Sequence, residues 1–151
     1  EQQQQIIAMI EKAREEGANI LTGGYAPDLS GYFVLPTIIE ATPEMSIAQQ
    51  EVFGPVMVIM PFETEDEAVA IANGTDFGLV AGVFGENLNQ TLRVANRLVA
   101  GQVFINEWFA GGIETPFGGV GLSGFGREKG QEAIFSYVQT RNIGIRLQHN
   151  V

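Results

Sequence analysis

The glycine-rich stretch at residues 116–130 has the clearest potential for chemistry. Gly119, Gly121 and Gly124 follow the spacing Gly-x-Gly-x-x-Gly, which in dinucleotide-binding proteins brings backbone N–H groups close to a pyrophosphate. That role requires a strand directly before the glycines and an acidic residue about 20 positions further on. The stretch comes after the last buried strand that we expect, and no acidic residue follows on a suitable strand. We therefore predict a shaped loop rather than a phosphate-binding one.

Side chains for nucleophilic catalysis and for metal binding are scarce. The 151-residue sequence has no cysteine, and its one histidine is His149. A cysteine nucleophile, a disulfide, a histidine-based triad and a histidine or cysteine metal cluster are therefore not expected. Acidic residues such as Glu65, Asp66 and Glu67 fall at the start of an expected helix, where they complement the helix dipole. We expect neither a catalytic residue nor a metal site in this chain.

Composition narrows the class of protein and its partners. The formal net charge is -10, which argues against nucleic acid and against anionic membrane surfaces as partners. With 45% hydrophobic residues, the chain can bury a core, and its length predicts one domain over residues 1–151. No apolar run approaches the ~20 residues that cross a bilayer, and the start has no basic-then-apolar signal. A cytoplasmic protein is the default expectation.

The elements that must position any site follow an alternating pattern of strands and helices. Residues 56–60 and 80–84 are typical of strands covered on both faces, and residues 102–105 predict a third strand. Thr64 and Asn87 are candidate N-caps for the helices between them. This order predicts an α/β fold with a mostly parallel, Rossmann-like sheet and flanking helices.

The two ends of the chain complete this outline. The patterns predict a helix over 2–16 that stops at Gly17, strands over 19–22 and 32–39, and a helix over 132–137. Pro36 makes the second of these strands irregular or an edge strand. Residues 140–147 alternate apolar and polar side chains, which predicts a half-exposed C-terminal edge strand able to pair with another chain.

Five short motifs, in this order, resemble signatures of the aldehyde dehydrogenase superfamily. They are Gly31-Tyr-Phe33 with Pro36-Thr37, Glu51-Val-Phe-Gly-Pro55, Asn73-Gly-Thr-Asp-Phe-Gly-Leu79, Gly101-Gln-Val-Phe-Ile-Asn106, and Pro116-Phe-Gly-Gly119 followed by Ser123-Gly-Phe-Gly-Arg-Glu128. The family often has a lysine two residues after Gly119, and Gly121 stands there in this sequence.

The resemblance covers only the last third of a family member. It implies a partial catalytic domain over residues 1–137 and a terminal oligomerisation strand and tail over 138–151. The family's nucleophilic cysteine, general-base glutamate and most of its dinucleotide site lie upstream of the matching region. The intact enzyme would use NAD or NADP, and we expect this chain alone to bind neither and to oxidise no aldehyde.

The resemblance also assigns roles to two residues of the second motif. Glu51 matches the glutamate that accepts hydrogen bonds from the hydroxyls of the nicotinamide ribose, and a carboxylate suits this role because it only accepts. Phe53 matches the aromatic residue that packs beside the nicotinamide. Without the resemblance, Glu51 would be interpreted as capping a turn and Phe53 as a core residue.

Four further residues receive roles in the same way. Phe117 matches an aromatic residue of the aldehyde tunnel, and Trp108 and Phe109 fall in the variable loop that shapes this tunnel. Core packing is the alternative interpretation for all three. Glu128 has at most a secondary role as a proton relay, and it and Arg127 otherwise suit pairing or binding to the backbone.

Three functions remain open. The first is a C-terminal fragment of an NAD(P)+-dependent aldehyde dehydrogenase, inactive alone. The second is a non-enzymatic assembly module, and the third is a subunit that complements a separately encoded N-terminal part. We expect a homo-oligomer formed through the exposed sheet and the terminal strand. The aldehyde, and the choice between NAD and NADP, stay open.

Overall fold

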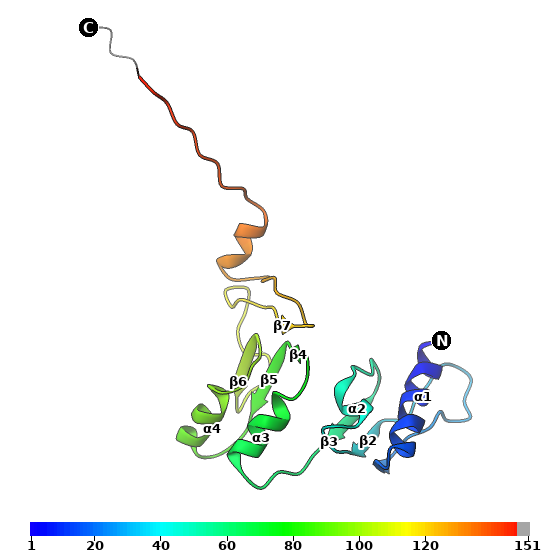
Figure 1. The fold of residues 1–151 in the computed structure, drawn as a ribbon. Helices are drawn as coiled ribbons and strands as arrows, with labels where there is room; N and C mark the ends of the chain where they lie inside the picture. Colours follow the sequence, from blue (N-terminus) through cyan, green and yellow to red (C-terminus); the bar gives the residue numbers. More distant parts are fainter. Residues whose placement is uncertain (148–151) are drawn as a thin grey trace.

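A computed structural model describes residues 1–147 as an α/β chain (Figure 1). Residues 148–151, which include His149 and the end of the expected tail, lie outside this description. The first half contains α1 (Gln2–Glu15), β1 (Asn19–Thr22), β2 (Thr37–Glu40), α2 (Ser46–Gln49) and β3 (Val56–Ile59). The second half contains α3 (Glu65–Ala72), β4 (Phe77–Gly78), β5 (Val80–Val83), α4 (Leu88–Ala95), β6 (Gln102–Ile105), β7 (Val120–Gly121) and a 3₁₀ helix, η1 (Glu132–Ser136).

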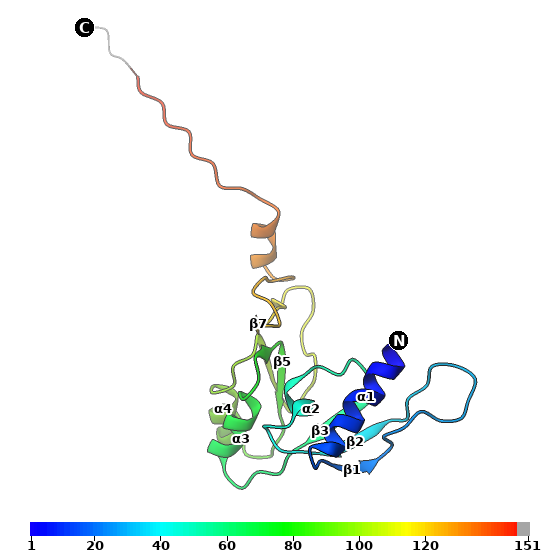
Figure 2. The same ribbon diagram turned by 45° about the vertical axis from the view of Figure 1, so that its right-hand side comes forward.

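Helix α1 packs on a three-stranded sheet, and Figure 2 shows the two together. The sheet has the order β1-β2-β3, with an antiparallel β1–β2 pair and a parallel β2–β3 pair. Ile10 of α1 and Ile39 of β2 are fully buried between the two layers. Gly17 ends α1 at φ 95°, and the N–H of Ala18 donates to the carbonyl of Ala13 at 2.9 Å. The predicted helix and its stop are confirmed.

The segment before β2 is irregular, and Thr37 anchors it. The buried Thr37 hydroxyl accepts a hydrogen bond from the N–H of Gly24 and donates one to the carbonyl of Leu35, both at 2.8 Å. The strand predicted over 32–39 therefore begins only at Thr37. Pro36, which lacks an N–H for a strand ladder, directly precedes it.

The second half is built on a parallel crossover unit. Strands β5 and β6 pair in parallel, and α4 connects them. Both predicted caps form, because Thr64 accepts from the N–H of Glu67 at 3.1 Å and Asn87 accepts from that of Gln90 at 3.2 Å. The α4 helix ends at Ala95, and Asn96 is its C-cap.

The α/β class is confirmed, but the sheet is divided. In residues 1–147, β3 pairs with β2 and β5 pairs with β6, so no continuous sheet runs through the strands of 56–105. Nor is β3 covered on both faces, since Met57 is 54% exposed and Ile59 38%. The inward side chains of Val56 and Val58 pack against the core around α1, while those of Met57 and Ile59 on the outer face remain exposed.

The C-terminal expectations are only partly met. Residues 132–137 contain the short 3₁₀ helix η1 rather than an α-helix. Residues 140–147 form no strand within the described chain, and they extend away from the rest (Figure 1). A strand requires a hydrogen-bonded neighbour, and none is present among residues 1–147. The predicted half-burial is likewise absent in the described chain, because Ile143, Ile145 and Leu147 are all at least 66% exposed.

Hydrogen bonds join the C-terminal end of α1 to the start of α2. The Glu16 carboxylate accepts hydrogen bonds from the N–H of Ser46 at 2.7 Å and from its hydroxyl at 3.0 Å. These bonds, with the nearby charge of Lys12, hold the pKa of Glu16 below its ordinary value. None of the helices described is both long and apolar enough to cross a bilayer.

Candidate functional site

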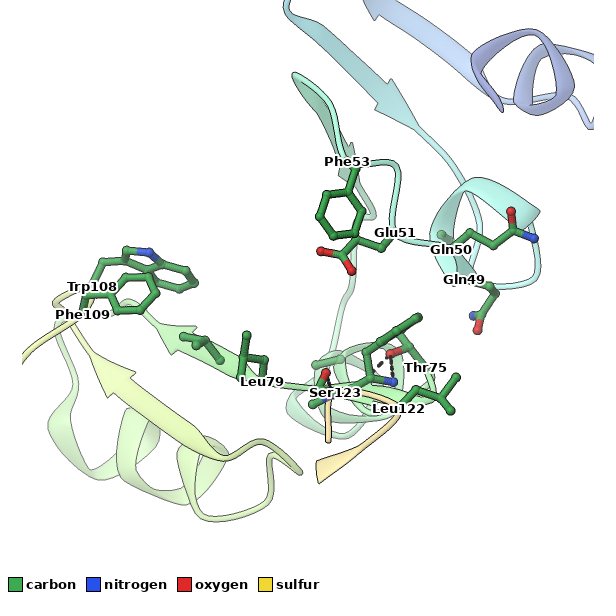
Figure 3. Close-up of a pocket in the computed structure, with 15 residues that line it drawn as sticks. Gln49, Gln50, Glu51, Phe53, Thr75, Leu79, Trp108, Phe109, Leu122 and Ser123 are labelled. Carbon is green, nitrogen blue, oxygen red and sulfur yellow. Dashed lines mark hydrogen bonds between the residues drawn. The ribbon is translucent and has the colours of Figure 1, made fainter. Parts of the chain in front are cut away.

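Four of the predicted site residues line one groove of about 770 Å³. Glu51 and Phe53 come from the loop between α2 and β3, and Trp108 and Phe109 from the loop after β6. Figure 3 shows the two pairs on opposite walls, with Leu79 and Ser123 on the floor between them. The groove therefore joins the two halves of the chain.

The wall of Glu51 and Phe53 offers a carboxylate and an aromatic ring to the groove. Phe53 has φ 52° and is 73% exposed, so it does not belong to the core of residues 1–147. Gly54 packs against Ile6 of α1, and a Cβ there would lie 2.5 Å from the Ile6 Cδ1. The side chain of Gln2 donates to the carbonyl of Phe53 at 3.2 Å. Helix α1 thus supports this turn.

The Glu51 carboxylate projects into the groove (Figure 3). Within residues 1–147 it accepts no side-chain or backbone hydrogen bond, so the alternative of a turn cap is not seen there. An ionised carboxylate has only acceptor sites, and it can receive two hydroxyl groups from one ligand.

The opposite wall is a cluster of aromatic rings. The ring centroids of Trp108 and Phe109 are 5.7 Å apart at 83°, an edge-to-face arrangement that aromatic pairs favour. Both rings also contact Phe104 of β6, which is buried. Trp108 and Phe109 remain 55% exposed, so this wall is apolar and accessible.

Phe117 and Glu128 lie outside this groove. They line a neighbouring hollow of about 920 Å³, and their backbones pair through two hydrogen bonds of 2.7 Å. The two hollows share Leu79 and Ser123 in their linings, and the Phe117 ring centroid lies 6.4 Å from that of Phe109. The ammonium of Lys129 lies 5.7 Å from the Phe117 ring centroid. The structure thus separates Phe117 from Trp108 by one ring.

Arg127 of the glycine-rich stretch binds backbone. The Arg127 guanidinium donates to the carbonyls of Gly119 at 2.7 Å and Gly126 at 2.8 Å, as predicted for a structural residue. Upstream, N–H groups of Glu114 itself and of Gly112, together with the charge of Lys129, lower the pKa of Glu114. The described residues contain no group of three His, Cys, Asp or Glu side chains placed to hold a metal ion.

Sequence reasoning missed two residues that shape the aromatic wall. Gly82 lies directly under the Trp108 indole, and the Asn106 side chain binds the backbone of Gly85. A signal for Gly82 was present, because glycine inside a strand often marks the close approach of another group. In the sequence, Asn106 is distinguished only as the last residue of the motif that starts at Gly101.

Comparisons with known proteins place this chain in a family. Residues 1–143 match the Aldehyde dehydrogenase family. The betaine aldehyde dehydrogenase of Cereibacter sphaeroides is 48% identical over 143 residues, which are 94% of this chain and 30% of that protein. The chain therefore spans about 30% of the length of this relative.

Solved structures agree with the sequence relatives. Betaine aldehyde dehydrogenase from Staphylococcus aureus, crystallised in complex with NAD+, has a TM-score of 0.86 at 40% identity, covering 90% of this chain and 28% of that one. An NAD-dependent aldehyde dehydrogenase from Sinorhizobium meliloti has a TM-score of 0.89 at 37% identity, covering 99% and 30%. The chain belongs to the aldehyde dehydrogenase family.

Proposed function

We propose that this chain is part of an NAD+-dependent aldehyde dehydrogenase that converts an aldehyde and water to a carboxylic acid, reducing NAD+ to NADH and releasing one proton. The observation that carries the proposal is the groove in which Glu51 and Phe53 face Trp108 and Phe109. The structural relative from Staphylococcus aureus was crystallised with NAD+, which favours NAD+ over NADP+.

The groove residues fit the nicotinamide end of the cofactor. The free Glu51 carboxylate suits two ribose hydroxyls, because it accepts and they donate. The exposed Phe53 ring beside it supplies an apolar face for the nicotinamide. NAD+, when bound, accepts a hydride from the aldehyde carbon. The pyrophosphate finds no strand–glycine–helix site among the described residues, so we assign only this end of the cofactor to the chain.

This chain's own residues bind and orient in the proposed reaction. Glu51 fixes the ribose, Phe53 packs on the nicotinamide, and Trp108 and Phe109 line the aldehyde's approach and exclude water. Phe117 extends this apolar lining, and Glu128 serves at most in relaying a proton. The thiolate of the family's mechanism comes from another segment, because the sequence contains no cysteine.

Formation of NADH tests this proposal. We expect no NADH from the purified chain with any aldehyde, because the nucleophile is missing. A chimera in which this chain replaces the matching segment of the Cereibacter enzyme should oxidise aldehyde, while the remaining part of that enzyme alone should not. A chimera that folds and binds NAD+ but forms no NADH would overturn the assignment, as would activity of the chain alone.

Self-association is a second candidate function. It is favoured by the exposed apolar side chains of Met57 and Ile59 on β3 and by the extended residues 138–147. Extended backbone without a hydrogen-bonded neighbour offers its N–H and C=O groups to another chain. We expect dimers or larger species in light scattering of the purified chain, and fewer of them after deletion of residues 138–151. A monomer at high concentration would contradict this.

A complementing subunit is the remaining alternative, and mixing tests it. The chain combined with the separately produced rest of the Cereibacter enzyme would then form NADH without covalent linkage. Activity of the fused chimera together with an inactive mixture would support the fragment and count against complementation.

A further inference from the structure

Trp108 rests directly on the backbone of β5. A Cβ added to Gly82 would lie 2.9 Å from Cζ3 of the indole and 3.0 Å from Cε3. Real Cβ atoms essentially never come closer than 3.0 Å to another heavy atom, so alanine at position 82 requires this edge of the indole to shift. The edge of the indole that carries Cζ3 and Cε3 therefore packs against Gly82.

Asn106 fixes the chain on which Trp108 is carried. Its Oδ1 accepts from the N–H of Gly85 and its Nδ2 donates to the carbonyl of Gly85, both at 2.8 Å. These two bonds tie the end of β6 to the segment after β5, two positions before Trp108. Asn106 has φ 55°, a left-handed conformation that asparagine tolerates better than most residues.

Two phenyl rings lie beside the indole. The Phe104 centroid lies 6.3 Å away at 53°, and that of Phe109 5.7 Å away at 83°. The ring is thus held from below by Gly82 and at its sides by two phenyl rings. Its exposed part faces the groove toward Phe53 (Figure 3).

We propose that Gly82 and Asn106 are positioning residues for Trp108, and that they set how far the indole reaches into the groove and hence how wide an aldehyde it admits. This inference rests on the proposed function for its consequence, but the position of the indole is measured independently. With alanine at position 82, the ring moves outward and narrows the groove, which then favours slender, unbranched aldehydes over bulky ones.

Tryptophan fluorescence of the full chain tests the contact between Gly82 and the Trp108 indole. Trp108 is the single tryptophan, so emission reports only this site. We expect Gly82→Ala to shift the emission to longer wavelength and to increase quenching by acrylamide, because the indole is lifted from its seat. Gly126→Ala is the matched control, since a Cβ there meets nothing within 4 Å. Unchanged emission in Gly82→Ala, or an equal change in Gly126→Ala, would overturn the proposal.

The Asn106 clamp has a matched control in the chain. The Asn73 side chain also binds backbone through both of its polar atoms, here in the segment that precedes β6. It donates to the carbonyl of Arg97 at 2.9 Å and accepts from the N–H of Val99 at 2.8 Å. Replacing either residue by aspartate removes the donor and sets a carboxylate against a carbonyl oxygen. Asn106→Asp should shift Trp108 emission under native conditions, and Asn73→Asp should not. Equal shifts would assign Asn106 to general stability and refute a positioning role.

The consequence for substrates is read in the active chimera. Gly82→Ala should raise KM for a branched aldehyde more than for a linear aldehyde of equal carbon number, with little change in the kcat ratio. If the emission shifts but the ratio of KM for the branched aldehyde to KM for the linear one stays the same, the effect of Gly82 on the width of the groove is refuted. An inactive chimera would instead reject the proposed function. The fluorescence measurements would still show whether Gly82 and Asn106 position the Trp108 indole.

Discussion

An active chimera carrying Glu51→Gln should show a KM for NAD+ about 10- to 100-fold higher than its parent. Hydrogen bonds to a charged group contribute about 1.5–3 kcal/mol each. Glutamine keeps one acceptor oxygen but turns an NH₂ donor toward a ribose hydroxyl that also donates. The Glu51 carboxylate accepts nothing within residues 1–147, so this loss falls on the cofactor rather than on the fold.

The control for this variant is Glu107→Gln. It removes the same charge from the loop that carries Trp108, outside the lining of the groove. We expect its KM for NAD+ to remain near that of the parent, and both variants to unfold at the parent's urea concentration. An unchanged KM in Glu51→Gln would remove the ribose-binding role. Equal increases in both variants would assign the effect to net charge.

Replacing Gly101 with alanine should destabilise the second half of the chain by about 3 kcal/mol, at the upper end of what overpacking costs. A Cβ at Gly101 would overlap the carbonyl oxygen of Gly118, and it would crowd the Cα of Gly119. These are backbone atoms, so no flexible side chain can move aside. Gly101 also donates its N–H to the carbonyl of Gly78 at 3.0 Å, which holds it in place.

Urea unfolding measures this effect, with Gly126→Ala as the control. Alanine at an unhindered glycine changes stability by less than about 1 kcal/mol, because it mainly restricts the unfolded chain. We expect the midpoint to fall for Gly101→Ala and to stay near the parent's for Gly126→Ala. Similar midpoints for the two variants would show that the glycine-rich stretch moves away from β6 at little cost.

The close approach of Gly118 and Gly119 to Gly101 explains how the glycine-rich stretch takes part in the fold. Gly118 and Gly119 pass over the start of β6, and Gly121 joins β7, where it pairs with Phe77. Arg127 then holds the loop by two carbonyls. The glycines thus permit close backbone packing next to the hollow of Phe117.

Local features could be predicted from the sequence because they depend on residues a few positions apart. The caps at Thr64 and Asn87 each join a side chain to an N–H three residues later, and Gly17 supplies a left-handed turn within the same helix end. The motifs identified the family in the same way. Each of these signals is complete within a short stretch of chain.

Only the tertiary structure decided which distant segments meet. An apolar run such as residues 56–59 suits any sheet, and its pairing with β2 rather than β5 depends on α1 covering that sheet. The placement of Phe117 beside the neighbouring hollow, and of Gly82 beneath Trp108, likewise depends on contacts between residues far apart in sequence. The alternation of apolar and polar residues over 140–147 predicts which side chains would share one face of a strand. A strand forms only where a second strand supplies its hydrogen bonds.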